Sequence, residues 1–402
     1  MKIGQISDLH YCQKYLEEVD RCTSYAVDEI INSNCDVAVI SGDSTDHRLD
    51  LHSPSTAALV GQVRRLADNM PTITLHGTSS HEPPGTLEVF KTIGGKHPVY
   101  VADKIKQVAI VNGQWIESEN WIFDVIPQGT TALFSVLPSV NKGAIAASQG
   151  IENIDVAVGE YVFEIMKGWA SVNARARLAG IPTIGVSHGT IVGSITEHGI
   201  PMHGLDFEFT EGSLFAAETS AFMLGHIHQM QVFHKDNRKI AYPGSIGRLH
   251  FGELTDKGFL IWNVEPNSAE CEFITTPARS LLQIDYDGTP DMEELAELSK
   301  KSENAYVRVR YQIDEEHKAS VNKKAIEAMF LEAGARECKV QGHINPIHRV
   351  RSQGINKCPS MSERLRMWTE TTDFEADNEE LSIRLNTLQS HDAQEIVDSI
   401  MV

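Results

Sequence analysis

The sequence lacks paired cysteines and any long apolar run. Its six cysteines are scattered over 402 residues without a C-x-x-C pair, so the pattern predicts neither a structural zinc cluster nor a disulfide framework, and buried reduced thiols are expected. No apolar run reaches the roughly 18–20 residues that a membrane helix needs, so no membrane association is predicted. The N-terminus runs into a strand-like pattern without the layout of a signal peptide. These absences predict a cytoplasmic protein.

Basic residues are also scarce. The chain has 35 Lys and Arg against 55 Asp and Glu, a net charge of −20, which argues against nucleic-acid binding because phosphate contacts depend on Lys and Arg. The excess of acidic over basic residues is, however, unevenly distributed along the chain. The net charge is −13 over residues 1–276 and zero over residues 277–372, and within the latter segment residues 336–366 have a net charge of +5. Such a basic stretch could hold a phosphate backbone, and a solvated charged face explains it equally well.

The apolar pattern predicts an α/β protein of two or three domains. Apolar residues make up 41% of the chain and charged residues 22%, which is typical of a globular protein and excludes wholesale disorder. In the first 80 residues, buried strands are predicted at 3–7, 37–41 and 72–76, and amphipathic helices at 16–32 and 55–66. This alternation predicts a layered core with parallel strands. Further strand signals follow, one of them at residues 121–125.

The pattern restarts after Pro277. Strands and helices alternate again up to about residue 345, and a polar connector then leads to helical segments near the C-terminus. We therefore predict domains at 1–276, 277–345 and 346–402. A terminal helical segment behind a polar linker docks on a partner or packs on its own chain, and the pattern leaves both open.

Polar motifs follow five of the predicted strands directly. They are Asp8-Leu9-His10, Gly42-Asp43, Gly77-Thr78-Ser79-Ser80-His81-Glu82, Ser187-His188-Gly189 and Gly225-His226-Ile227-His228. Open α/β sheets place their sites at strand ends, and mixed Asp and His ligands suit Mn²⁺, Fe²⁺ or Zn²⁺. Two such ions bridged by one carboxylate can clamp a phosphate and activate an attacking water. Each motif alone is weak, since a single strand-end histidine is more often structural, but the five together favour a two-metal site.

In this order the motifs resemble the signature of the calcineurin-like metallophosphoesterase superfamily: D-x-H, G-D-x-x-D, G-N-H-[DE], a lone His and G-H-x-H. The resemblance implies a layered β-sandwich flanked by helices, and two divalent ions with Mn²⁺ as the first choice. It assigns one ion to Asp8, His10 and His228, the second ion to His188 and His226, and the bridging position to Asp43. His81 corresponds to the histidine that contacts the scissile phosphate, and is the implied catalytic residue.

One motif departs from the family pattern. The segment from Gly77 to His81 is longer by two residues, and aligning His81 puts Ser80 where the family has an Asn ligand. A serine hydroxyl is a shorter and weaker neutral ligand, so this alignment predicts a looser second metal.

Later features are similar to those of SbcD-type DNA nucleases, including the related phage recombination endonuclease subunits. These features are the Tyr242-Pro243-Gly244-Ser245 segment, the loop at residues 137–142, and the extra domain and tail after Pro277. The resemblance implies a DNA exonuclease/endonuclease subunit for repair and recombination, with a smaller α+β domain that caps the site and contacts double-stranded DNA. It also implies that the helical C-terminal segment binds an SbcC-type SMC-like ATPase, with a homodimer of this chain in a heterotetramer.

Two other functions are weighed against the nuclease. A stand-alone phosphodiesterase or phosphatase on a small or protein substrate fits the acidic residues 1–276, but needs neither the extra domain nor the tail. A non-enzymatic scaffold with a decayed site is disfavoured because seven matched residues persist. His47 and His52 follow Asp43 closely and stay unassigned, since an exposed loop histidine explains them as well as a role in placing DNA.

Overall fold

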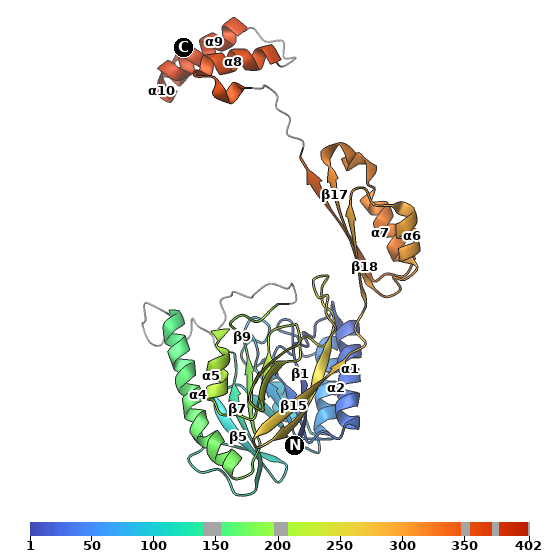
Figure 1. The fold of residues 1–402 in the computed structure, drawn as a ribbon, viewed down its shortest axis with the longest axis vertical. Coiled ribbons are helices and arrows are strands. Elements are labelled where there is room, and N and C mark those ends of the chain that lie inside the picture. Colours follow the sequence, from blue (N-terminus) through green and yellow to red (C-terminus); the bar gives the residue numbers. More distant parts are fainter. Residues whose placement is uncertain (140–153, 197–207, 347–353, 372–377, 401–402) are drawn as a thin grey trace. The chain divides into compact units, whose positions relative to one another are not determined.

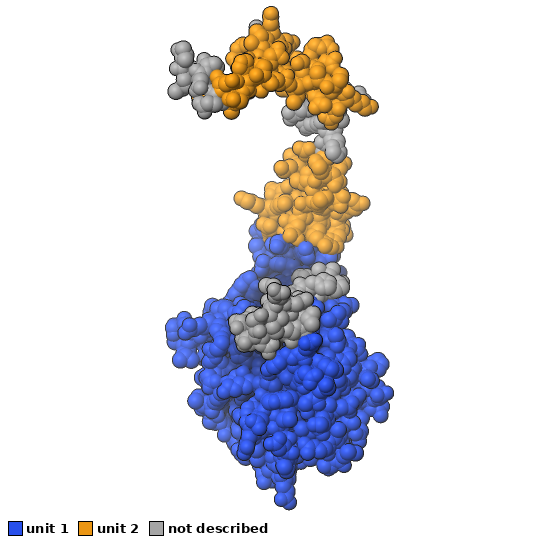
Figure 2. Space-filling model, turned by 90° about the vertical axis from the view of Figure 1, so that its left-hand side faces the viewer, with its two compact units in different colours: residues 1–283, 296–308, 328–339 blue, residues 284–295, 309–327, 340–402 orange. Residues whose placement is uncertain are grey.

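The computed structural model describes residues 1–139, 154–196, 208–346, 354–371 and 378–400 (Figure 1). These residues confirm the predicted layered α/β fold. The chain divides into two compact units, coloured separately in Figure 2. The first comprises Met1–Gln283, Ala296–Arg308 and Ala328–Lys339, and the second comprises Ile284–Leu295, Val309–Glu327 and Val340–Val402. The domain boundaries predicted at 276 and 345 stay a prediction.

One sheet of the first unit contains the predicted N-terminal strands. Its order is β15-β14-β1-β2-β3-β4, with β1 to β4 mutually parallel and β14 antiparallel to β1. The strands are β1 (Lys2–Ile6), β2 (Val37–Ile40), β3 (Thr72–Leu75), β4 (Val99–Ala102), β14 (Gly258–Glu265) and β15 (Ser268–Thr275). Helices α1 (Leu16–Asn32) and α2 (Pro54–Ala67) pack on its outer face (Figure 1). Helix α2 starts with Pro54 after Ser53, whose hydroxyl accepts from Thr56 N–H, a typical helix start.

The second sheet has the order β12-β13-β11-β8-β7-β5-β6. Its strands are β5 (Lys106–Val111), β6 (Gln114–Glu117), β7 (Thr130–Leu137), β8 (Thr183–His188), β11 (Ala221–Gly225), β12 (Gln231–Lys235) and β13 (Arg238–Tyr242). Helices α4 (Ile154–Leu178) and α5 (Glu211–Ala216) lie on its outer side (Figure 1). Two short strands, β9 (Thr190–Ile191) and β10 (Glu208–Phe209), form a separate parallel pair.

Apolar side chains fill the space between the two sheets. Val39 of β2, Phe134 of β7, Val186 of β8 and Trp262 of β14 belong to one buried cluster. Complete burial of a side chain of this size contributes roughly 1.5–3 kcal/mol, so the sandwich is held together mainly by this layer. Within each sheet the parallel strands end at a common edge, and the polar motifs follow those ends.

The predicted strand at residues 121–125 is wrong. That segment is a loop, and the chain forms β6 just before it, through a hairpin whose turn is Asn112-Gly113 with φ of 52° and 74°. Two aromatic residues of the loop anchor it to the rest of the unit. Phe123 is buried and its N–H donates to Gln107 Oε1 at 3.1 Å, while Trp121 lies close against Gly168 of α4. The side chains that anchor this loop thus have the same apolar sequence pattern as a buried strand.

The remaining elements follow β15. A three-stranded sheet has the order β16-β17-β18, made by β16 (Leu281–Asp287), β17 (Tyr306–Asp314) and β18 (Glu337–Asn345), with α6 (Met292–Ser299) and α7 (Lys323–Glu332) between them in sequence. The last helices are α8 (Met361–Thr371), α9 (Asn378–Ser390) and α10 (Ala393–Ile400). Among the described residues, no helix is both long and apolar enough to cross a membrane.

Candidate metal centre

The five motifs converge where β1, β2 and β3 of one sheet, and β8 and β11 of the other, end. Hydrogen bonds tie the loops together: Asp8 N–H donates to Gly42 O at 3.1 Å, and His10 N–H donates to Asp43 O at 3.0 Å. Asp8, His10 and Asp43 have φ of 51°, 50° and 51°, in a left-handed region that residues other than glycine seldom adopt. Such strained residues cluster at functional sites.

Two glycines permit this close approach. A Cβ at Gly77 would lie 2.3 Å from both the backbone nitrogen and Oδ1 of Asp43, and one at Gly225 would lie 2.2 Å from Ser41 O. Only glycine fits at these positions, because the clashes involve backbone atoms that cannot turn away. The glycines that open the third and fifth motifs therefore have a packing role behind the polar side chains.

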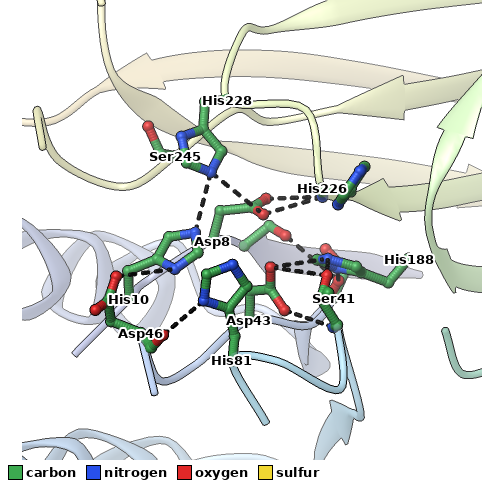
Figure 3. Close-up of polar contacts among 12 residues, drawn as sticks. Asp8, His10, Ser41, Asp43, Asp46, His81, His188, His226, His228 and Ser245 are labelled. Carbon is green, nitrogen blue, oxygen red and sulfur yellow. Dashed lines mark hydrogen bonds and ion pairs between the residues drawn. The ribbon is translucent and has the colours of Figure 1, made fainter. Parts of the chain in front are cut away.

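Asp8, His10 and His228 form the first group of potential metal ligands (Figure 3). Both carboxylate oxygens of buried Asp8 accept from His226 N–H, at 3.0 and 3.1 Å. The Nε2 atoms of His10 and His228 lie 3.0 Å apart. Burial and the nearby His228 lower the pKa of His10 to about 3. His10 is therefore neutral near pH 7, the state in which imidazole binds a metal.

The buried ion pair of Glu253 and Lys257 orients the His228 ring through its Nδ1 side. His228 Nδ1–H donates to Glu253 Oε1 at 3.1 Å, which leaves Nε2 facing His10. Lys257 Nζ lies 3.2 Å from the same oxygen, and donates to His228 O at 2.9 Å and Ser245 Oγ at 2.8 Å. Burial alone would raise the pKa of Glu253, but His228 and Lys257 hold it well below its usual range. In metal sites, a ligand histidine commonly donates the N–H of its other ring nitrogen to a carboxylate in this way.

Asp43, His188 and His226 form the second group. His188 Nδ1–H donates to Ser41 O at 2.8 Å, so its Nε2 faces Asp43 Oδ2 at 3.1 Å. Burial lowers the pKa of His188, but the Asp43 carboxylate outweighs this effect and raises it to about 10. His188 therefore holds a proton near pH 7 in the metal-free protein, and a metal ion bound between the two side chains would displace that proton. Burial, and then the nearby His188, lower the pKa of His226 to about 4. The His226 ring is therefore neutral near pH 7, the state in which imidazole binds a metal.

The two groups suit a pair of divalent ions. Each supplies one carboxylate and two imidazoles, a set suited to Mn²⁺, Fe²⁺ or Zn²⁺. Figure 3 shows Asp43 between His10 of the first group and His188 of the second. The structure thus brings together all six residues that the sequence predicts as ligands, while their coordination of metal stays a prediction.

His81 lines a cavity of about 410 Å³ together with His10 and His228 of the first group and Asp43 and His226 of the second. Its Nδ1 pairs with Asp46 O at 2.6 Å, so this nitrogen carries the proton and Nε2 is left as an acceptor when the ring is neutral. The ring of His81 lies edge-on to that of His10, with 4.8 Å between centroids. This placement allows contact with a phosphate held by the metal ions. The catalytic role of His81 itself stays a prediction.

The structure places Thr78, and not Ser80, beside the second group. Thr78 Oγ1 lies 3.3 Å from Asp43 Oδ2 and 3.4 Å from His188 Nε2, while Ser80 is exposed. Glu82 is buried and accepts from Gly77 N–H at 2.6 Å and Ser44 N–H at 2.5 Å, which joins the loops after β2 and β3. Burial and Asp43 raise the pKa of Glu82 to about 7.

Sequence reasoning missed Thr78, Glu253 and Lys257. For Thr78 a signal existed, because it follows Gly77 directly as Asn follows Gly in the family pattern. Glu253 and Lys257 gave no local signal, since both pair with His228 across more than twenty positions. His47 is exposed and pairs with Asp46 Oδ2 at 3.0 Å. Within the predicted loop at 137–142, residues 140–142 lie outside the described residues.

Comparisons with known proteins found a sequence similarity over part of the chain. No family model matches the chain. Over 90 residues, however, it is 32% identical to YhaO of Bacillus subtilis, described as an uncharacterized metallophosphoesterase. This similarity spans only about a fifth of either protein: 22% of this chain and 21% of the relative.

Solved structures give distant similarities. GAP50, the anchor in the inner membrane complex of Plasmodium, aligns with a TM-score of 0.41 and 14% identity, over 69% of this chain and 85% of that one. A dimetal phosphatase from Danio rerio aligns with a TM-score of 0.39 and 10% identity, over 69% and 99%.

Proposed function

We propose that this protein is a two-metal phosphoesterase that hydrolyses phosphodiester bonds of DNA. The observation that carries the proposal is the pair of ligand groups at converging strand ends, with Asp43 between them. The sequence similarity to a metallophosphoesterase supports the same reaction class. Two divalent ions held there, with Mn²⁺ as the first choice, would supply Lewis-acid activation of the phosphate and of an attacking water.

The residues of the chain have separable tasks in this reaction. Asp8, His10 and His228 would hold one ion, His188 and His226 would hold the other, and Asp43 would be the carboxylate shared by both. His81 keeps Nε2 available because its Nδ1 is engaged by Asp46 O. In its imidazolium form, His81 would use Nε2–H to donate a hydrogen bond to the phosphate or a proton to the leaving oxygen.

The elements beyond β15 support DNA as substrate. Every proposed ligand lies before residue 229, so a hydrolase of small substrates needs neither the β16–β18 sheet with α6 and α7 nor helices α8 to α10. Residues 336–366 supply the local positive charge. Within that stretch Arg349 and Arg351 lie outside the described residues, whereas Arg364 and Arg366 are exposed on α8. Exposed arginines suit phosphates or an acidic partner.

Phosphatase or phosphodiesterase activity on a small or protein substrate is the second candidate. The charge of −13 over residues 1–276 favours it, because an acidic surface repels a DNA backbone. Hydrolysis of linear duplex DNA, bis-p-nitrophenyl phosphate and p-nitrophenyl phosphate with Mn²⁺ separates the two. We expect cleavage of DNA and of the diester, abolished by EDTA and by Asp43→Ala. Turnover of the monoester alone, or of the diester without DNA cleavage, would replace the nuclease proposal by the phosphatase or the phosphodiesterase, respectively.

The partner proposal has its own test. We propose that helices α8 to α10 bind a coiled-coil ATPase of the SMC-like type, and that the assembly contains two copies of this chain. Ile383, Leu388 and Val397 are exposed apolar residues on α9 and α10, as a partner-binding segment requires. Deleting residues 361–402 should remove ATPase association and leave hydrolysis of bis-p-nitrophenyl phosphate unchanged. Normal association of the truncated chain would refute this role.

A further inference from the structure

Three donor atoms beside β3 form a nearly equilateral triangle. Asp43 Oδ2 and His188 Nε2 lie 3.1 Å apart, and Thr78 Oγ1 lies 3.3 Å from the first and 3.4 Å from the second. Ligands that bind a small divalent ion at about 2.0–2.2 Å lie roughly 2.8–3.6 Å from one another in tetrahedral or octahedral sites. The three atoms therefore have the spacing of one face of a coordination polyhedron.

The backbone holds Thr78 in this position. Its N–H donates to Asp43 Oδ1 at 2.6 Å, and its carbonyl accepts from His81 N–H at 2.9 Å and Glu82 N–H at 2.8 Å. The same residue is thus tied to the proposed bridging carboxylate and to the turn that carries His81. Ser80 lies in that turn but is exposed. The two extra residues of this loop therefore lie after the ligand position, and not before it.

We propose that the Thr78 hydroxyl is a neutral oxygen ligand of the ion held by Asp43, His188 and His226. This assignment rests on the proposed two-metal function. A hydroxyl donates less electron density than the amide oxygen of Asn, so this ion would be bound more weakly than with an Asn ligand at the same position. Mn²⁺, which accepts neutral oxygen ligands readily, suits such a position.

The test is Mn²⁺ binding to the full chain by calorimetry and by electron paramagnetic resonance, which detects two neighbouring ions through their magnetic coupling. Thr78→Val removes the hydroxyl but keeps the β-branched shape and the backbone N–H to Asp43. We expect this variant to keep one Mn²⁺ with unchanged affinity, to bind the second at least tenfold more weakly, and to lose the coupled signal. Thr78→Ser, which keeps a hydroxyl, and Ser80→Ala should both retain the coupled pair.

Each other outcome overturns a specific statement. A coupled pair in Thr78→Val with affinities within twofold of the wild type would refute Thr78 as a ligand. Loss of the second ion in Ser80→Ala would transfer the role to Ser80. Absence of any coupled pair in the wild-type protein would refute the two-metal function itself. If Thr78→Val does not fold by circular dichroism, Thr78→Ala tests the same loss of the hydroxyl.

Discussion

The buried pair of Glu253 and Lys257 should stabilise both the fold and the first metal position. Both side chains are completely buried, 3.2 Å apart, and the carboxylate also accepts from His228 Nδ1–H. Glu253→Gln keeps the size of the side chain but leaves the Lys257 ammonium buried without its counter-charge. Removing one partner of such a pair costs about 3–5 kcal/mol.

This change is large enough for simple assays. At roughly 2 °C per kcal/mol for a unit of this size, the melting temperature of the metal-free protein should fall by about 6–10 °C. Because Glu253 also fixes the tautomer and orientation of His228, Mn²⁺ affinity at the first position should fall by about 10–100-fold. Differential scanning calorimetry measures the first effect and isothermal titration calorimetry the second.

Glu297→Gln is the matched control. Glu297 pairs with Lys300 at 2.6 Å, but both side chains are largely exposed, at 74% and 66%. Exposed pairs contribute little because water screens them, so this variant should melt with the wild type. A melting temperature for Glu253→Gln within 1 °C of the wild type, with unchanged Mn²⁺ affinity, would refute the role assigned to the buried pair.

Three further predictions concern the site and the thiols. Asp43→Ala should abolish hydrolysis and coupled Mn²⁺ binding together, because its carboxylate lies between both ligand groups; two ions retained in calorimetry would contradict the bridging role. His81→Ala should lose turnover by about 10²–10⁴-fold yet keep both ions; loss of an ion would make His81 a ligand instead. Burial raises the pKa of Cys22 to about 12 and of Cys35 to about 11, so native protein at pH 8 should leave both unmodified by Ellman's reagent. Thiols in the unfolded chain ionise near pH 9, so the stability that comes from burying the neutral thiols is complete below that pH and is lost as the pH rises above it. Urea unfolding at pH 8 and pH 10 measures this loss. Rapid modification of either thiol at pH 8 would contradict the raised pKa values.

The sequence alone predicted the layered fold and the strand ends that carry the polar motifs. Both are local properties: a short apolar run marks a buried strand, and the polar residues directly after it lie at the edge where parallel strands end. Asp8 and Asp43 follow neighbouring parallel strands of one sheet, so their common edge was predictable from local pattern. His226 follows a strand of the other sheet, and its place beside them was implied by the family resemblance. The strand predicted at 121–125 failed because anchoring apolar residues in a loop have the same local pattern as a strand.

Only the tertiary structure decided what surrounds those residues. Thr78 and Ser80 both precede His81 with a hydroxyl, and only the folded turn shows which one reaches Asp43 and His188. Glu253 and Lys257 are charged residues that sequence reasoning places at the surface, and their complete burial follows from pairing with each other and with His228 across the fold. Such pairing depends on distances between residues far apart in the chain, a quantity that neither composition nor periodicity contains.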